Sequence, residues 1–301
     1  MIHKAVIPVA GLGTRLYPIT RSIGKEFIPV IDTDGLVKPV ILIILEQLYN
    51  SGIDEICLIV SCDEDIKTYK KFFQTPISEE YNKKLSNQMH RFEKKIFDIG
   101  KKLSFRVPKE NKGFGYSVLQ AADFCDGEPV LLLLGDTIYR SKSQKTCSKQ
   151  IIEAYEKLKR PIVSIHETKL NDVIHYGILS GTWDDKNKTL MNVTEFIEKP
   201  TVEYAKKFLG VKRDNDKFSY YSVFGQYILT PEVFLALDDN IKSGKAIEKN
   251  GEIGLTAVLA SFINSSTNNG ASGLYGVVLS GKMFDTGNAQ AYMETLRKYN
   301  R

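Results

Sequence analysis

The stretch Ala5–Glu26, AVIPVAGLGTRLYPITRSIGKE, decides how the rest of the chain is interpreted. It begins with an apolar run short enough for a buried strand and then breaks at Gly11 and Gly13. Glycines allow a sharp turn and let backbone N–H groups approach a ligand with no Cβ in the way. Because such a turn at the end of a strand commonly holds phosphate in α/β proteins, the stretch predicts a polyphosphate site.

Two cations in the same stretch suit phosphate oxygens. Arg15 carries a fork-shaped guanidinium and Lys25 a mobile ammonium group. A dinucleotide-binding fingerprint needs a third glycine where Leu16 stands, which argues against a Rossmann dehydrogenase. A Walker A loop needs Gly-Lys-Ser/Thr, and this stretch does not contain that motif. Two glycines alone are as typical of an ordinary strand-to-helix turn. The longer pattern GxGTRLxPxT…GKE is much more specific.

Composition excludes several classes of protein. Of the 301 residues, 43% are hydrophobic and 26% charged, as in a globular protein with a sizeable core. The net charge of +5 is spread without a basic stripe, so it favours a small anionic substrate over nucleic acid. The longest apolar run, residues 40–45, is too short to span a membrane. The four cysteines have neither C-x-x-C nor zinc spacing, and no signal peptide precedes the first strand, so we expect a cytoplasmic protein.

The order of elements predicts an α/β fold in a single domain. Residues 5–10, 40–50 and 55–61 predict strand, helix and strand, hence parallel strands with a right-handed crossover. Residues 77–99 predict one long amphipathic helix, because apolar side chains recur there every three or four positions. After residue 171, short alternating segments predict antiparallel strands. We therefore predict a mixed, mostly parallel central sheet flanked by helices, with a smaller, partly antiparallel region.

The glycine stretch resembles the signature of the sugar-1-phosphate nucleotidyltransferases, most closely the bacterial UTP–glucose-1-phosphate uridylyltransferases. Further motifs follow in the family's order, so the resemblance extends from Lys4 to about Tyr299. It implies a Rossmann-like nucleotidyltransferase fold, with residues 1–170 mainly binding the nucleotide and residues 171–301 mainly the sugar phosphate. It also implies Mg²⁺-dependent transfer of a nucleotidyl group from UTP to glucose 1-phosphate, and a homo-oligomer, dimer or tetramer.

Two carboxylates are the candidate metal ligands. Asp136 follows the most apolar predicted strand, in LLLLGDTIY, at the strand end where open α/β sheets bind ligands. A carboxylate facing phosphates suits Mg²⁺, although an aspartate that only forms the next turn is more common. Asp285 lies in a D-x-G-N segment that by itself resembles a polar turn before a helix. The resemblance implies that Asp136 and Asp285 together hold Mg²⁺.

The resemblance also assigns sugar and nucleotide contacts. On its own, Glu198-Lys199 is an ordinary surface pair, but the family motif places Glu198 on sugar hydroxyls and Lys199 on the sugar phosphate, with Tyr176-Gly177 beside the ring. Arg15, Lys25 and Lys199 are the implied catalytic residues. The implied nucleotide contacts are Ala10, Gly11, Leu12, Gly13, Thr14, Glu26 and Gly113.

Departures from the family pattern leave the identity of the nucleotide base open. Pro108 stands where a base-binding glutamine is usual, and proline offers neither an amide side chain nor a backbone N–H. Tyr116 replaces a common histidine, and Gly24 replaces a proline. A glucose-1-phosphate thymidylyltransferase is the alternative enzyme, although Lys25-Glu26 favours uridylyl transfer over the Lys-Gln of that group. A non-catalytic, sugar-nucleotide-binding relative is the alternative outside catalysis.

Overall fold

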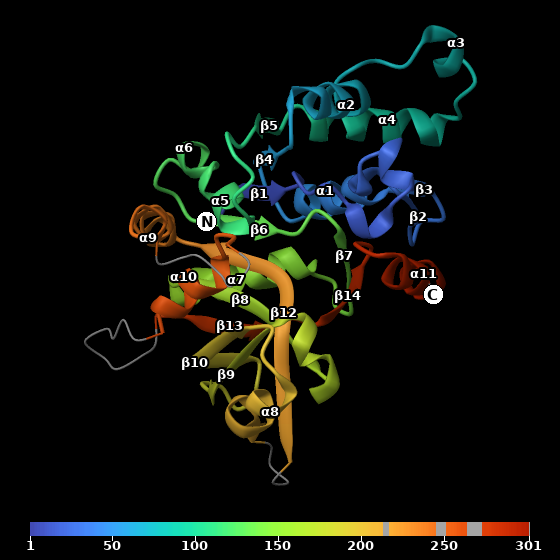
Figure 1. Ribbon diagram of the computed structural model, residues 1–301. Helices are drawn as coiled ribbons and strands as arrows, with labels where there is room; N and C mark the ends of the chain where they lie inside the picture. The colour runs from blue at the N-terminus through green and yellow to red at the C-terminus, as the bar shows by residue number, and fades with distance from the viewer. Residues whose placement is uncertain (213–216, 245–250, 264–272, 301) are drawn as a thin grey trace.

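The computed structural model describes residues 1–212, 217–244, 251–263 and 273–300. One large mixed sheet runs through it, with helices on both faces (Figure 1). Its strands are β1 (Lys4–Pro8), β4 (Glu55–Ile59), β5 (Leu103–Arg106), β6 (Val130–Leu133), β8 (Ile162–Thr168), β9 (Gly177–Trp183), β10 (Leu190–Glu198), β11 (Val211–Lys212), β12 (Phe218–Leu229) and β13 (Tyr275–Val278). Two small sheets pair β2 (Pro29–Ile31) with β3 (Val37–Pro39), and β7 (Thr137–Ser141) with β14 (Gly281–Asp285).

The first half of the sheet is parallel and buried on both faces. The strands β5, β4, β1 and β6 lie side by side in that order, all parallel. Side chains of β1 alternate between the faces: Ala5 and Ile7 pack into one apolar cluster and Val6 into the other. This double burial explains the continuous apolar runs of these strands. The predicted strand, helix and strand are β1, α1 (Val40–Asn50) and β4.

The second half is mainly antiparallel and is built on β12. This strand pairs antiparallel with β6, β8 and β9, while β10 pairs antiparallel with β9 and β13. Among the described residues, β8 and β13 form the parallel pair of this half. The sheet is mixed, as predicted, but parallel pairing has a smaller share than expected, because β12 inserts between β6 and β8 at the centre.

Helices cover both faces of the sheet. Those on one face are α1, α2 (Asp63–Phe73), α4 (Asn87–Gly100) and α7 (Cys147–Leu158). Those on the other are α5 (Phe114–Leu119), α6 (Ala122–Cys125), α9 (Pro231–Lys242) and α10 (Leu255–Ser261). The remaining helices are α3 (Glu79–Asn82), α8 (Val202–Tyr204) and α11 (Ala289–Lys298).

The prediction of one helix over residues 77–99 is wrong. The segment forms the single turn α3 and then α4, because two serines start separate helices. The Ser78 hydroxyl accepts a hydrogen bond from the Tyr81 N–H, and the Ser86 hydroxyl accepts one from the Met89 N–H. Such N-caps stabilise a helix start by about 1 kcal/mol. The apolar periodicity continues across the interruption between the two helices, and the capping serines mark where each helix begins.

The ribbon formed by β7 and β14 was not predicted. Residues 137–141 and 281–285 are short and lie far apart in the sequence, and neither carries a strong strand pattern. They pair in register from Gly281↔Ser141 to Asp285↔Thr137. The ribbon therefore brings the C-terminal segment to the end of β6.

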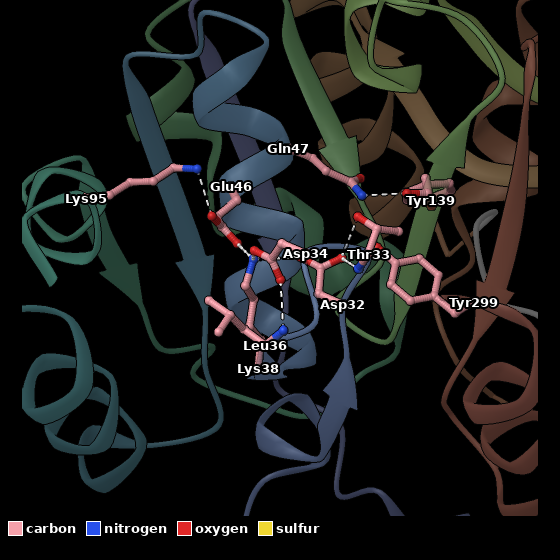
Figure 2. Close-up of polar contacts among 10 residues, drawn as sticks. All are labelled: Asp32, Thr33, Asp34, Leu36, Lys38, Glu46, Gln47, Lys95, Tyr139 and Tyr299. Atoms are coloured by element: carbon pink, nitrogen blue, oxygen red, sulfur yellow. Dashed lines mark hydrogen bonds and ion pairs between the residues drawn. The ribbon is translucent and has the colours of Figure 1, made fainter. Parts of the chain in front are cut away.

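A buried network of charges fixes the β2–β3 hairpin to the core. Figure 2 shows the Lys38 ammonium among the carboxylates of Asp32, Asp34 and Glu46, at distances of 2.7, 2.6 and 2.7 Å. The Tyr299 hydroxyl, directly after α11, donates to Asp32 at 3.1 Å. Lys38 is only 3% exposed, and its ion pairs join the hairpin to α1. The hydrogen bond from Tyr299 to Asp32 joins the residue after α11 to the same network.

Candidate active site

The glycine turn at the end of β1 is tightly packed on its own segment. Gly13 has φ 64°, a left-handed conformation that favours glycine, and a Cβ there would lie 2.8 Å from Cγ2 of Thr20. The Thr20 hydroxyl donates to the Gly13 carbonyl at 3.3 Å. Gly11 faces Lys25: a Cβ at Gly11 would lie 3.4 Å from the lysine Nζ. The turn thus places the backbone of Gly11 next to the Lys25 ammonium group.

Lys25 forms an ion pair with Asp136. Its Nζ donates to Oδ2 of Asp136 at 2.7 Å, and both side chains are 15% exposed. Burial by itself lowers the pKa of Lys25, but the charge and hydrogen bond of Asp136 outweigh burial, so the pKa lies above its usual value. The loop cation and the carboxylate after β6 therefore face one space.

Asp285 joins this pair from the other end of the chain. The Thr286 N–H and hydroxyl donate to the Asp136 carbonyl at 2.9 and 2.8 Å, which fixes the end of β14 next to Asp136. The Gly287 N–H donates to Oδ1 of Asp285 at 2.6 Å. Burial raises the pKa of Asp285, and the nearby Asp136 charge adds to the rise.

Gly287 marks the point where the charged groups converge. A Cβ at this buried glycine would lie 2.9 Å from Oδ2 of Asp136, 3.1 Å from Oδ1 of Asp285 and 3.3 Å from Nη2 of Arg15. Four side chains predicted from separate segments, those of Arg15, Lys25, Asp136 and Asp285, therefore meet around one backbone position. The sequence pointed to Gly287 only as part of the D-x-G-N motif.

The carboxylate pair suits a hard divalent cation. Carboxylate oxygens are preferred by Mg²⁺, which commonly takes one or two of them and completes its shell with water and substrate phosphates. Within the described ranges, no group of three or more His, Cys, Asp or Glu side chains that could hold a metal ion is present. A cation held by the two carboxylates would therefore need further ligands such as phosphate oxygens and water. The positive Lys25 ammonium bound to Asp136 shows that this position attracts a cation.

The predicted sugar motifs lie together at the paired ends of β9 and β10. Glu198 is opposite Gly177 in the register, and the Lys199 N–H donates to the Tyr176 carbonyl at 3.0 Å. A Cβ at Gly177 would lie 3.0 Å from Oε2 of Glu198, so the glycine leaves room for that carboxylate. Burial raises the pKa of Tyr176, and the charge of Asp285 adds to the rise. The backbone contacts between the ends of β9 and β10 therefore bring the two sugar motifs to one place.

Gly113 lies in a separate loop that one segment connects to Glu198. Its φ is 101°, and a Cβ there would lie 2.7 Å from Cβ of Glu252. The Ile253 N–H donates to the Lys112 carbonyl at 2.7 Å. Three residues on, the Thr256 hydroxyl donates to Oε2 of Glu198 at 2.8 Å. Thr256 was not predicted as a site residue, because its contact with Glu198 depends on the packing of α10 against β10.

Glu26 is buried one residue after Lys25. It is 4% exposed, and burial raises its pKa to about 7. Its Oε1 has no hydrogen-bond partner among the described residues.

Within the part of the chain that the structure describes, no helix is both long and apolar enough to cross a bilayer.

Comparisons with known proteins agree with this geometry. The model of the nucleotidyl transferase family matches residues 4–301. A protein of Bacillus subtilis (strain 168), whose name assigns it provisionally as a UTP–glucose-1-phosphate uridylyltransferase, is 30% identical over 98% of this chain and 96% of its own. UTP–glucose-1-phosphate uridylyltransferase 2 of Streptococcus pyogenes serotype M1 is 28% identical over 99% and 90% of the two chains.

A solved structure extends the similarity to three dimensions. The crystal structure of a UDP-glucose pyrophosphorylase complexed with UDP-glucose superposes with a TM-score of 0.78 at 27% identity, covering 99% of this chain and 98% of that one. The match to the family model extends over nearly the whole sequence. The chain belongs to the nucleotidyl transferase family.

Proposed function

We propose that this protein transfers a uridylyl group from UTP to glucose 1-phosphate, giving UDP-glucose and pyrophosphate. The observation that carries the proposal is the convergence of Arg15, Lys25, Asp136 and Asp285 around Gly287. The pairing of the Glu198 and Lys199 motif with Tyr176-Gly177 supports it. The uridylyltransferase names of the relatives support the choice of reaction.

The reaction needs positioning and charge neutralisation more than a nucleophilic side chain. A phosphate oxygen of the sugar phosphate attacks the α-phosphorus, the new P–O bond forms, and the bond to pyrophosphate breaks. Arg15 and the N–H groups of the glycine turn hold the leaving pyrophosphate. Lys25 neutralises charge at the α-phosphate, and Lys199 holds the incoming phosphate in line. Glu198, with Tyr176 and Gly177, orients the sugar.

Asp136 and Asp285 are the proposed Mg²⁺ ligands. When bound, Mg²⁺ would neutralise the triphosphate charge that builds up during transfer. The Lys25 ammonium, which Asp136 holds at 2.7 Å, would neutralise charge at the α-phosphate. Asp285, whose carboxylate is partly desolvated, gains most from a nearby cation, because its negative charge is poorly hydrated.

The base and the cellular context belong to the same proposal. With proline at position 108, backbone groups of the Gly113 loop must read the base edge, and thymidylyl transfer is the competing reaction.

The four cysteines are free thiols and three are buried, which fits the cytoplasmic location we propose. Exposed Ile31 and Val37 of the β2–β3 hairpin, with Met293 and Leu296 of α11, fit a homo-oligomer, which light scattering tests.

Pyrophosphate release with Mg²⁺ and glucose 1-phosphate tests the function, with UTP, dTTP, CTP, ATP and GTP supplied separately. We expect selective release with UTP. Asp136→Asn and Lys199→Ala should lower kcat by at least about 100-fold, whereas Lys67→Ala, a surface control, should not. Preference for dTTP would select the thymidylyl alternative, and no release with any nucleotide would favour the non-catalytic relative.

A further inference from the structure

The helix α11 lies beside β14 and the β2–β3 hairpin (Figure 1). A surface helix normally packs on the rest of a protein through an apolar stripe. In α11 the pattern differs, because Met293 and Leu296 are 51% and 42% exposed, while Thr295 is the buried residue of the helix. A buried hydroxyl costs free energy unless it forms a hydrogen bond. Apolar packing alone therefore does not explain this side chain.

The Thr295 hydroxyl holds the backbone of a proposed metal ligand. It donates to the main-chain carbonyl of Asp285 at 2.8 Å. The other polar group of the same peptide, the Thr286 N–H, donates to the Asp136 carbonyl at 2.9 Å. A peptide group is planar, so fixing its carbonyl from α11 and its N–H from the segment after β6 sets its orientation.

The Asp285 carboxylate depends on the same backbone. The next N–H along the chain, that of Gly287, donates to Oδ1 of Asp285 at 2.6 Å. A Cβ at Gly287 would lie 3.1 Å from this Oδ1 and 2.9 Å from Oδ2 of Asp136, so both carboxylates pack tightly on one backbone position. A small shift of the peptide that Thr295 holds would therefore move one proposed metal ligand relative to the other.

Two tyrosines on the same side of the helix as Thr295 anchor α11. Tyr292, Thr295 and Tyr299 follow one another at steps of three and four residues, which places them on one face. The Tyr292 hydroxyl donates to the Pro29 carbonyl at 2.7 Å, and the Tyr299 hydroxyl donates to Asp32 at 3.1 Å (Figure 2). The helix is thus fixed to the β2–β3 hairpin, and Thr295 holds Asp285 from a firm support.

We propose that Thr295 is a positioning residue for the metal site: its hydroxyl fixes the backbone of Asp285 so that the carboxylates of Asp285 and Asp136 face one divalent cation. The inference rests on the proposed function, because it takes these two carboxylates as the Mg²⁺ ligands. Thr295 acts through Asp285 and takes no part in catalysis itself. Partners that orient a metal ligand in this way contribute about 10- to 100-fold to metal affinity.

Calorimetry of UTP binding, with Mg²⁺ and with EDTA, measures the contribution of the metal. Glucose 1-phosphate is left out, so no turnover takes place. The ratio of the two affinities is the Mg²⁺ enhancement. We expect Thr295→Val to lower this enhancement about tenfold and to change metal-free UTP affinity by less than about twofold. A general loss of structure would weaken both affinities, so the ratio separates positioning from stability.

Further variants identify the hydroxyl as the cause. Thr295→Ser keeps the hydroxyl and should keep the Mg²⁺ enhancement within about twofold of the wild type. Thr295→Ala deletes the same hydroxyl with a smaller side chain and takes the place of Thr295→Val if that variant does not fold. Ser164→Ala is the matched control, because the Ser164 hydroxyl is also buried and donates to the Gln226 carbonyl at 2.6 Å. It should lower Tm and leave the Mg²⁺ enhancement unchanged.

The Mg²⁺ concentration for half-maximal pyrophosphate release is a second readout. It should rise about tenfold in Thr295→Val and stay unchanged in Ser164→Ala. Because this readout follows turnover and the calorimetric one does not, agreement between them ties the change to the metal.

Three results would overturn the proposal. An equal Mg²⁺ enhancement in Thr295→Val and the wild type would show that Thr295 does not position Asp285, and the proposed function would stand. An enhancement that is as low in Thr295→Ser as in Thr295→Val would show that the hydroxyl is not the cause. Equal UTP affinity with Mg²⁺ and with EDTA in the wild type would overturn the proposed metal site and this inference together.

Discussion

Adding a single methyl group at Gly287 is the sharpest perturbation of the proposed active site. The Gly287→Ala side chain would lie 2.9 Å from Oδ2 of Asp136 and 3.1 Å from Oδ1 of Asp285. The first distance is shorter than real Cβ contacts, and the second requires its neighbour to move by a few tenths of an ångström. The methyl group would also lie 3.3 Å from Nη2 of Arg15. It therefore displaces the proposed metal ligands and the phosphate-binding cation together.

The effect on turnover should be large and the effect on stability small. Misplacement of reacting groups on the scale of 1 Å costs about 100-fold in rate, and we expect kcat to fall by about 10- to 100-fold. Gly287 is not among the glycines with positive φ, so alanine can adopt its backbone conformation. The contacts that it strains are with side chains that can move. We expect Tm within about 2 °C of the wild type.

Gly52→Ala is the matched control with the opposite pattern. Gly52 has φ 84°, and nothing lies within 4 Å of the Cβ position. Alanine in this left-handed conformation costs about 1–2 kcal/mol, which lowers Tm by about 2–5 °C, while turnover stays unchanged. Steady-state pyrophosphate release and thermal unfolding measure both variants. A Gly287→Ala enzyme with kcat within about threefold of the wild type would refute the convergence argument.

Three further predictions concern buried polar groups. Burial raises the pKa of Glu26 from 4.5 to about 7, so the folded state keeps a proton that the unfolded state has released. The free energy of unfolding should therefore fall by about 3 kcal/mol as pH rises from about 4.5 to 7. Thermal unfolding from pH 5 to 8 should show this fall in the wild type and not in Glu26→Gln. Parallel pH profiles for the two proteins would contradict the prediction. Thr256→Val removes the hydrogen bond that orients Glu198, and we expect KM for the sugar phosphate to rise about tenfold with kcat nearly unchanged. Thr256→Ser should restore KM, and an equal fall in kcat for both variants would indicate a different role. Lys38→Met removes the cation shared by buried Asp32 and Glu46 and by the 45% exposed Asp34, although Glu46 keeps its ion pair with Lys95. It should cost about 3 kcal/mol in urea unfolding, whereas exposed Lys67→Met should cause no measurable change. Equal urea midpoints for Lys38→Met and the wild type would show that the network is well hydrated.

The location of the glycine turn could be predicted from the sequence because its causes are local. An apolar run followed by Gly11 and Gly13 needs only backbone conformational preferences and burial to be recognised, and β1 (Lys4–Pro8) lies within two residues of the strand predicted over residues 5–10. The strand, helix and strand over residues 5–61 follow in the same way from apolar periodicity. The order of motifs around Arg15, Lys25, Asp136 and Asp285 carried the resemblance to the family, and the family match extends over that range.

Contacts between distant segments were decided only by the tertiary structure. The pairing of β7 with β14 sets Asp285 next to Asp136, and this register depends on how the whole sheet packs, not on either short segment. The crowding around Gly287 and the hydrogen bond from Thr256 to Glu198 arise in the same way. The sequence by itself determined which chemical groups the chain carries and where the strongly apolar strands of the parallel half lie. Only packing decided which of those groups meet, because a side chain's neighbours across a fold depend on the positions of all the elements between them.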